Sequence, residues 1–216
     1  MRVNINVPTD LSEISLRQYQ KFLEVQKEND NENFLATKMI EIFCDIENKN
    51  VFKIKAKDIH RITNILADMF EQKPQLITRF TMNGVEYGFI PNLDDMTLGE
   101  YVDLDTYISQ WDRMEYAMSV LYRPIKDKYK DKYNIEEYTA TDQEKMKDMP
   151  LSVVFGSMLF FYRLGIDLSR VMTNYLEGGS QTHLAAMDSL RKNGDGISQF
   201  THSLREILDD LKISLN

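Results

Sequence analysis

The segment from residue 76 to 90 constrains the fold most, because an Asn-Gly pair, a strong hairpin signal, lies between two runs of alternating residues. Asn83-Gly84 tolerates the positive φ angles of a type I′ turn. The alternating side chains are Leu76, Thr78, Phe80 and Met82 before the turn and Val85, Tyr87 and Phe89 after it. This pattern predicts a β-hairpin over 76–90, and Pro91 ends the second strand because proline cannot donate to a ladder.

A long helix is predicted directly after the hairpin. Thr97 and Glu100 have the spacing of a capping box, in which each side chain accepts a hydrogen bond from an otherwise unpaired backbone N–H. Apolar residues then recur at intervals of three and four, on one helical stripe: Leu104, Tyr107, Trp111, Met114, Met118 and Leu121. Because the residue before proline disfavours the α region, Arg123-Pro124 ends this helix, which is expected over 98–122.

Three helices are predicted in the N-terminal part. Ser15 and Gln18 form a second capping box, starting a helix that runs to about Lys27. After a polar turn, a second helix carries a broad apolar face made of Phe34, Leu35, Met39, Ile42, Phe43 and Ile46. Residues 51–54 are expected to be extended, and Asp58 is expected to cap a third helix.

The C-terminal half begins with residues 126–133, where lysines alternate with Asp and Tyr. This charge-balanced run is interpreted as a solvated connector, with a docking stripe for a partner as the alternative. Thr141 and Glu144 have capping-box spacing and predict a short helix before Pro150. Residues 150–176 are apolar on nearly all sides as far as Leu164, which predicts a central helix packed against the 104–122 stripe.

The last segment, residues 178–216, is predicted to be a mobile helical extension. It contains a glycine-rich break over 193–196, followed by apolar residues at helical spacing. These residues are Ile197, Phe200, Leu204, Ile207, Leu208 and Leu211. Two alternatives stay open, docking on its own domain and docking on a neighbouring molecule.

The predicted fold is mainly α, of the α+β class: a helical bundle with a small antiparallel hairpin or three-stranded sheet. The third strand would come from residues 3–7, where Val3, Ile5 and Val7 alternate with polar residues. The expected organisation is a helical N-terminal half over 1–124, a connector with a buried central helix over 125–177, and the extension over 178–216.

Catalytic and metal-binding patterns are sparse. The three histidines lie far apart, and no phosphate-binding loop or nucleophile motif occurs. Cys44 is the only cysteine and is predicted to be a buried thiol, whereas His60 is predicted to be a partly buried structural histidine. We therefore expect no enzymatic activity, cofactor or metal.

Charge and hydropathy limit the kinds of partner that this chain is expected to bind. The formal net charge of −8 opposes direct nucleic-acid binding. The longest nearly apolar run, residues 151–162, is shorter than the roughly 20 residues that cross a bilayer, so no membrane contact is expected.

Five acidic residues cluster at the start of the 98–122 helix: Asp94, Asp95, Glu100, Asp103 and Asp105. Acids at this position complement the helix dipole, which is the simplest interpretation. The alternative is a partner-binding face. The candidate partner-binding residues are Asp94, Asp95, Glu100 and Asp103, with Phe200, Leu204, Ile207, Leu208 and Leu211 in the extension.

Three stretches carry a resemblance to a known group of proteins: GVEYGFIPNLDDMTLGEYVDLDTYISQW followed by MSVLYRPI, the opening INVPTDLSEISLRQYQKFLEV, and MPLSVVFGSMLFFYRLG. Over most of residues 1–176 the chain resembles small proteins encoded in the virion-gene regions of crAss-like and related tailed phages of Bacteroidetes. Its layout is also distantly similar to tail assembly chaperones and baseplate-hub assembly factors.

The resemblance implies virion construction by protein–protein contact, without a cofactor. It implies portal, tail or neck proteins as partners, with self-association left open, and the host cytoplasm as the place of assembly. Whether the protein stays in the mature virion is left open. Competing hypotheses are a chaperone absent from the particle, a monomeric regulator that binds a host protein through the acidic 94–112 face, and cargo inside the head.

Overall fold

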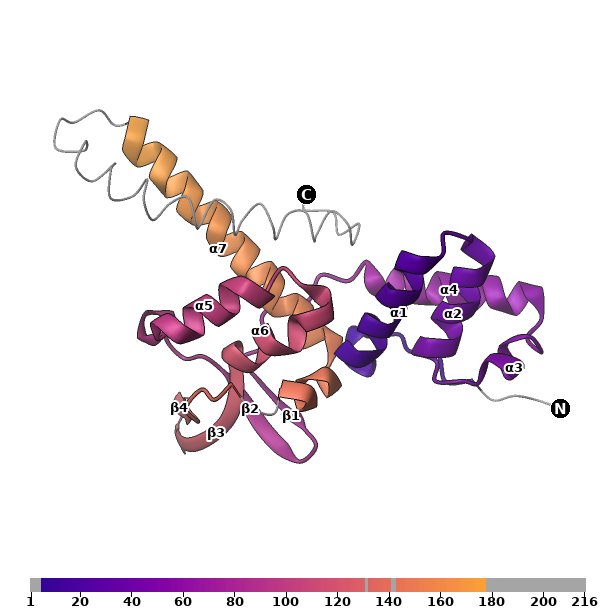
Figure 1. Cartoon of the computed structure of the whole chain (residues 1–216), viewed down its shortest axis with the longest axis horizontal. Coiled ribbons are helices and arrows are strands. Elements are labelled where there is room, and N and C mark those ends of the chain that lie inside the picture. The colour runs from indigo at the N-terminus through magenta and orange to yellow at the C-terminus, as the bar shows by residue number, and fades with distance from the viewer. Residues whose placement is uncertain (1–4, 131, 141–142, 178–216) are drawn as a thin grey trace.

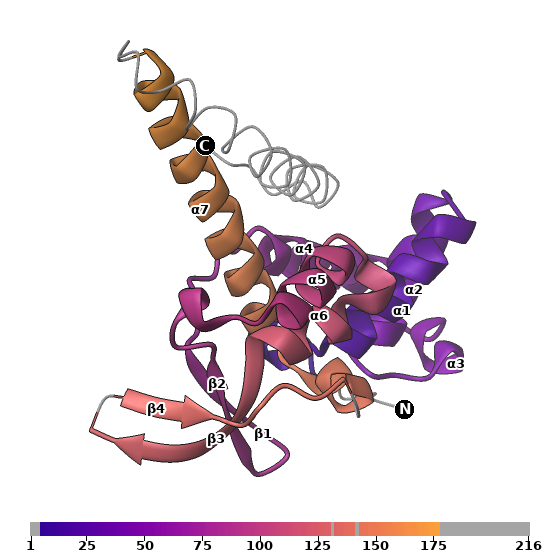
Figure 2. The ribbon, with the colours of Figure 1, turned by 60° about the vertical axis from the view of Figure 1, so that its left-hand side comes forward.

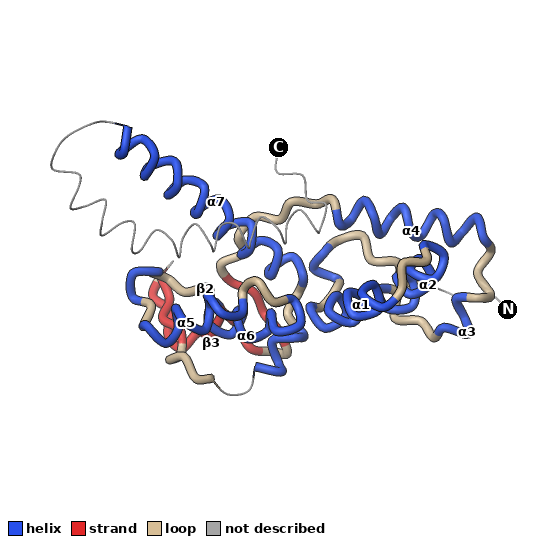
Figure 3. The backbone as a smooth tube through the Cα atoms, turned by 45° about the horizontal axis from the view of Figure 1, so that its top comes forward, coloured by secondary structure: helices blue, strands red, loops and turns tan. Residues whose placement is uncertain are grey.

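The computed structural model describes residues 5–130, 132–140 and 143–177, and its fold is α+β (Figure 1). Helices α1 to α4 form one side of the molecule, and a four-stranded antiparallel sheet with α5 and α6 forms the other (Figure 3). The prediction of a mainly helical α+β chain is confirmed at that level. A helical bundle is too narrow a description, and an all-α fold is excluded, because the sheet is a full part of the architecture.

The N-terminal side consists of η1 (Leu11–Glu13), α1 (Leu16–Glu28), α2 (Glu32–Phe43), α3 (Asn48–Val51) and α4 (Ala56–Phe70). The capping box of Ser15 and Gln18 starts α1 as predicted. The rings of Phe22 and Phe43 lie 5.2 Å apart, and those of Phe43 and Phe70 lie 5.3 Å apart. These contacts pack α1, α2 and α4 around a shared aromatic core.

Two local predictions on this side are wrong. Residues 51–54 are not extended. Val51 is the last residue of α3, and the chain then turns, with the N–H of Ile54 donating a hydrogen bond to the carbonyl of Val51. Asp58 does not cap α4; the N-cap is Lys55, and Asp58 lies in the first turn, where its charge still complements the helix dipole.

The predicted hairpin is confirmed as β1 (Arg79–Met82) and β2 (Val85–Phe89). Asn83 and Gly84 have φ angles of 51° and 77°, as a type I′ turn requires. The third strand, however, is not residues 3–7. Residues 5–7 form no strand, and residues 1–4 lie outside the described part. The place beside β2 is taken by β3 (Tyr122–Tyr129).

The predicted connector over 126–133 is instead a hairpin of β3 and β4 (Lys132–Ile135), giving the sheet order β1-β2-β3-β4. Only Tyr122, Arg123 and Pro124 of β3 pair with β2. The rest of β3 and β4 therefore extends beyond the other strands as a two-stranded ribbon (Figure 2).

The helix predicted over 98–122 is broken. It forms α5 (Leu98–Tyr107), η3 (Trp111–Arg113) and α6 (Met114–Leu121), preceded by η2 (Leu93–Asp95). The rings of Tyr107 and Tyr116 lie 4.9 Å apart, although nine residues of continuous helix would separate them by about 13.5 Å along the axis. The guanidinium of Arg113 lies 5.5 and 5.6 Å from these two rings. The break therefore folds α6 back against α5, and the capping box of Thr97 and Glu100 is confirmed.

Helix α7 (Leu151–Glu177) begins in the middle of the molecule and leads away from it (Figure 2). Its first part is buried from Leu151 to Leu159, as predicted for a central helix. It packs against the second half of the apolar stripe, because Ser157 Oγ lies 3.6 Å from Met118 Sδ and the rings of Trp111 and Phe155 are 5.8 Å apart. The extension over 178–216 and the capping residue Thr141 lie outside the described residues.

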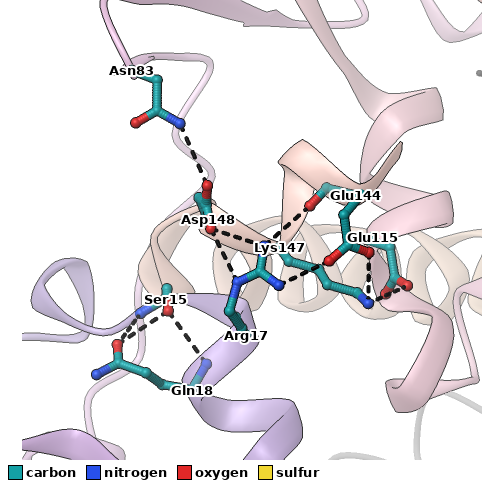
Figure 4. Close-up of polar contacts among 8 residues, drawn as sticks. All are labelled: Ser15, Arg17, Gln18, Asn83, Glu115, Glu144, Lys147 and Asp148. Atoms are coloured by element: carbon teal, nitrogen blue, oxygen red, sulfur yellow. Dashed lines mark hydrogen bonds and ion pairs between the residues drawn. The ribbon is translucent and has the colours of Figure 1, made fainter. Parts of the chain in front are cut away.

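A polar network joins the two sides of the molecule (Figure 4). Arg17 of α1 lies 2.8 Å from Glu144 and 3.2 Å from Asp148, both in η4 (Gln143–Asp148). Lys147 of η4 bonds Glu144 at 2.8 Å and lies 3.6 Å from the buried Glu115 of α6. Lys147 and Arg17 lower the pKa of the Glu144 carboxyl. One short helix thus holds both α1 and α6 through charged side chains.

Candidate protein-interaction surface

The acidic cluster at the start of α5 divides into an inner and an outer set. Glu100 belongs to the inner set, with a side chain only 5 % exposed. One of its carboxylate oxygens lies 2.8 Å from Arg123 Nη1 in β3. The other accepts a hydrogen bond from the backbone N–H of Thr97, with 2.7 Å between nitrogen and oxygen. A single side chain therefore caps α5 and attaches it to the sheet.

Asp103 also faces inward, three residues further along α5. It accepts a hydrogen bond from the hydroxyl of Tyr138, which follows β4, at 2.8 Å. Burial and this hydrogen bond raise the pKa of Tyr138 to about 12. The inner side of α5 is thus tied to β3 by Glu100 and to the segment after β4 by Asp103.

The opposite side of α5 exposes large apolar side chains. Leu98 is 79 % exposed, Tyr101 49 % and Val102 51 %. Positions i, i+3 and i+4 lie together on a helix, so these three side chains form one continuous stripe. The other large apolar side chains that are exposed in the described part of the chain lie at scattered positions: Phe34 in α2, Phe52 directly after α3, Val85 in β2 and Tyr129 in β3. A concentration of this kind on one helix is typical of an interaction site.

Three aspartates accompany the apolar stripe. Asp94 and Asp95 precede it in η2, and Asp105 follows it on the same side of α5, and all three are exposed. Within the part of the chain that the structure describes, none of these carboxylates forms an ion pair. We call the six residues together the α5 outer face: Asp94, Asp95, Leu98, Tyr101, Val102 and Asp105.

The structure separates the sequence-predicted partner-binding residues. Asp94 and Asp95 are on the α5 outer face, whereas Glu100 and Asp103 turn inward and hold the fold together. Their spacing explains the division, because positions 100 and 103 share a side of α5 with the buried Leu104. Phe200, Leu204, Ile207, Leu208 and Leu211 lie outside the described residues.

The apolar residues of the α5 outer face were missed by sequence reasoning, although a signal existed. Leu98, Tyr101 and Val102 fall beside the stripe that begins at Leu104, so the helix has more apolar surface than one core contact needs. The acidic residues between them dominate the local sequence pattern and hide this second stripe.

The remaining candidates for chemistry do not assemble into a site. Among the described residues, no three His, Cys, Asp or Glu side chains lie close enough to hold a metal ion. His60 is exposed, which corrects the prediction of a partly buried histidine, because α4 turns it away from the core. Cys44 is buried as predicted, and burial raises the pKa of its thiol to about 11.

No helix in the described ranges has the length and apolarity to cross a bilayer.

No family model, curated protein or solved structure matches this chain.

Proposed function

We propose that this protein is a non-catalytic bacteriophage structural or assembly protein that acts through protein–protein contacts while the tail or neck of the virion is built. The α5 outer face is the observation that carries the proposal. The phage setting comes from the resemblance of residues 1–176 to small virion-region proteins of tailed phages.

The composition of the α5 outer face fits protein recognition. Tyr101 offers a large, rigid ring with a polar hydroxyl, the kind of side chain that dominates interface energetics. The neighbouring aspartates would speed the approach of a basic partner and set its orientation. The matching surface on the partner, which we propose to be a portal, tail or neck protein, would be apolar at its centre and carry lysine or arginine at its edge.

The rigid inner side of α5 supports the same proposal. Because Glu100 fixes the helix to β3 and Asp103 fixes it to the segment after β4, the outer face is already ordered before a partner binds. Assembly would take place in the cytoplasm of the host bacterium.

Quantitative mass spectrometry of purified virions tests the proposal. A stoichiometric ratio to the portal protein, one copy per portal subunit or a small multiple, is the expected result for a neck or tail component. Absence from virions despite abundant expression in infected cells would overturn the structural role and favour an assembly chaperone. A monomer that copurifies only with a host protein would favour the regulator hypothesis.

A further inference from the structure

A groove lined by apolar and polar side chains lies where the two sides of the molecule meet. Its polar lining consists of Gln26, Lys27, Asp30, Ser109, Gln110 and Asp112. Its volume is about 730 Å³. Its apolar lining includes Tyr19, Leu23, Met39, Phe70, Trp111 and Phe155, contributed by α1, α2, α4, η3 and α7. This groove is separate from the α5 outer face, so its occupancy does not depend on the proposed function.

Aromatic rings pack against one another at the base of the groove, whereas the rings on its sides stay partly open to solvent. The ring of Tyr19 lies 5.0 Å from Trp111, 5.5 Å from Phe155 and 5.8 Å from Phe70. Tyr19 and Phe155 are buried, whereas Phe70 and Trp111 are only partly buried. An additional apolar side chain inserted between these rings would complete an aromatic cluster that the described residues leave open on one side.

The chain itself contains a segment of matching chemistry. In residues 197–211, six apolar residues recur at spacings that place them on one side of a helix, with Phe200 as the aromatic member. The charged and polar residues between them, including Arg205, Asp209 and Asp210, fall on the other side. Such a segment needs an apolar surface to cover one side only, which is what a groove provides.

The length of the chain allows this segment to reach the groove. Phe155 lies at the groove floor, and α7 continues for another 22 residues to Glu177, a distance of about 33 Å along the helix. Residues 178–196 could span up to about 60 Å if fully extended. The tether is therefore longer than the return path requires, and it raises the local concentration of the segment to the millimolar range.

We infer that residues 197–211 dock in this groove of their own chain, with Phe200 inserted among Tyr19, Phe70 and Trp111. Docking would cover the partly buried rings of Phe70 and Trp111 and hold the N-terminal helices against α7. Of the two alternatives for the extension, this inference adopts docking on its own chain.

Trp111 is the only tryptophan of the chain, so its fluorescence reports directly on the groove. The test variant is the full-length chain carrying Phe200→Asp and Leu204→Asp. The matched control carries Ser198→Asp and His202→Asp, which add the same charge on the other side of the segment. We expect the test variant alone to shift Trp111 emission to longer wavelength and to increase quenching by acrylamide. Adding a synthetic peptide of residues 195–216 should reverse both changes.

Three results would overturn the inference. Unchanged emission in the test variant would mean that the groove is empty or awaits a different protein. An equal shift in both variants would mean that charge, not docking, moves the spectrum. A shift in the unmodified chain that depends on protein concentration would mean that the groove receives a second copy.

A second measurement keeps the inference testable if the double variant fails to fold. Thr201→Cys is labelled with a nitroxide, which quenches tryptophan only at short range, and Ser180→Cys labelled in the same way is the control. The buried thiol of Cys44 is poorly reactive, so the label attaches at the new site. Quenching of Trp111 from position 201 but not from 180 is expected at low protein concentration. Equal quenching from both positions, or none, would contradict docking.

Discussion

Arg123 Nη1 lies 2.8 Å from Glu100 Oε1, and this ion pair attaches the inner side of α5 to β3. Both side chains are nearly removed from solvent, at 11 % and 5 % exposure. Because Glu100 also accepts the backbone N–H of Thr97, rotation of α5 would break the pair and the cap together. Leu98, Tyr101 and Val102 are exposed on the opposite side of α5.

Removing Arg123 should therefore destabilise the fold strongly. Arg123→Ala leaves the Glu100 carboxylate buried without its partner, a change that costs about 3 kcal/mol or more in the free energy of unfolding. Urea denaturation followed by far-ultraviolet circular dichroism measures it. The control Asp105→Ala removes an exposed charge on the same helix and should change stability by less than about 0.5 kcal/mol. Equal effects of the two variants would show that the ion pair does not anchor α5.

Substitutions on the α5 outer face should weaken partner binding and leave the stability of the fold nearly unchanged. Leu98→Asp with Val102→Asp replaces two exposed side chains, so each change should alter the free energy of unfolding by about 0.5 kcal/mol or less. If the face is an interface hot spot, partner affinity or incorporation into virions should fall about 30-fold or more. Phe52→Asp is the control, because Phe52 is 77 % exposed next to α3. Normal incorporation of the α5 variant would remove the face from assembly.

Two helical glycines should respond to alanine in opposite ways. A Cβ atom on Gly156 of α7 would lie 2.4 Å from the carbonyl oxygen of Gln75, a backbone atom that cannot easily move. Gly156→Ala should therefore lower the thermal unfolding midpoint, although alanine is the better helix former. A Cβ on Gly99 of α5 meets nothing within 4 Å, so Gly99→Ala should add up to about 1 kcal/mol of stability. A stabilised Gly156→Ala chain would refute the close approach of α7 to residue 75.

Local signals in the sequence predicted the elements that are determined locally. Asn83-Gly84 and the capping boxes at Ser15 and Thr97 each act over four residues or fewer, and all three are present. The hairpin of β3 and β4 gave no such signal. Its turn uses Lys130 with a φ angle of 54°, a conformation that lysine rarely adopts.

The interactions that fix this second hairpin are remote in the sequence. The hydroxyl of Tyr133 donates to the carbonyl of Phe89 at 2.8 Å, and the Tyr133 ring occupies the space that Gly88 leaves without a side chain. The broken helix has a similar origin, since the contact of Tyr107 with Tyr116 replaces continuous helix between them. Helical periodicity is unchanged by a break of this kind, so the spacing could not reveal it. The different roles of the acidic residues have the same origin. Glu100 binds Arg123 and Asp103 binds Tyr138, and only the fold brings these partners close to α5.

Cys44 should be almost inert in the folded protein. Burial raises the pKa of its thiol from 9.0 to about 11. Since the thiolate is the reactive form, near pH 8 this shift alone lowers the reactive fraction by about 100-fold. Labelling with a chromogenic disulfide reagent should be slow in buffer and fast in concentrated urea. Rapid labelling of the native chain would place Cys44 at the surface.

The stability of the fold should fall in alkali because of Tyr138. Its pKa in the folded chain is about 12, above the ordinary value of 10.0, because burial and the bond to Asp103 disfavour the tyrosinate. A raised folded-state pKa means that the contribution is complete below pH 10 and is lost as the pH rises toward 12. Tyr138→Phe removes this ionisation, so the variant should lose less stability over that window than the unmodified chain. Burial also raises the pKa values of Tyr19 and Tyr122, so part of the alkaline loss should persist.

Urea unfolding midpoints at intervals between pH 9 and pH 12 would measure the difference, with Tyr129→Phe as the control. Tyr129 is 73 % exposed at the end of β3, so it provides the same substitution away from Asp103. If Tyr138→Phe follows the same curve as the control, the hydroxyl of Tyr138 is not held by Asp103. Asp103 would then not help to fix the inner side of α5, and replacing Asp103 with Asn should leave stability near neutral pH unaffected.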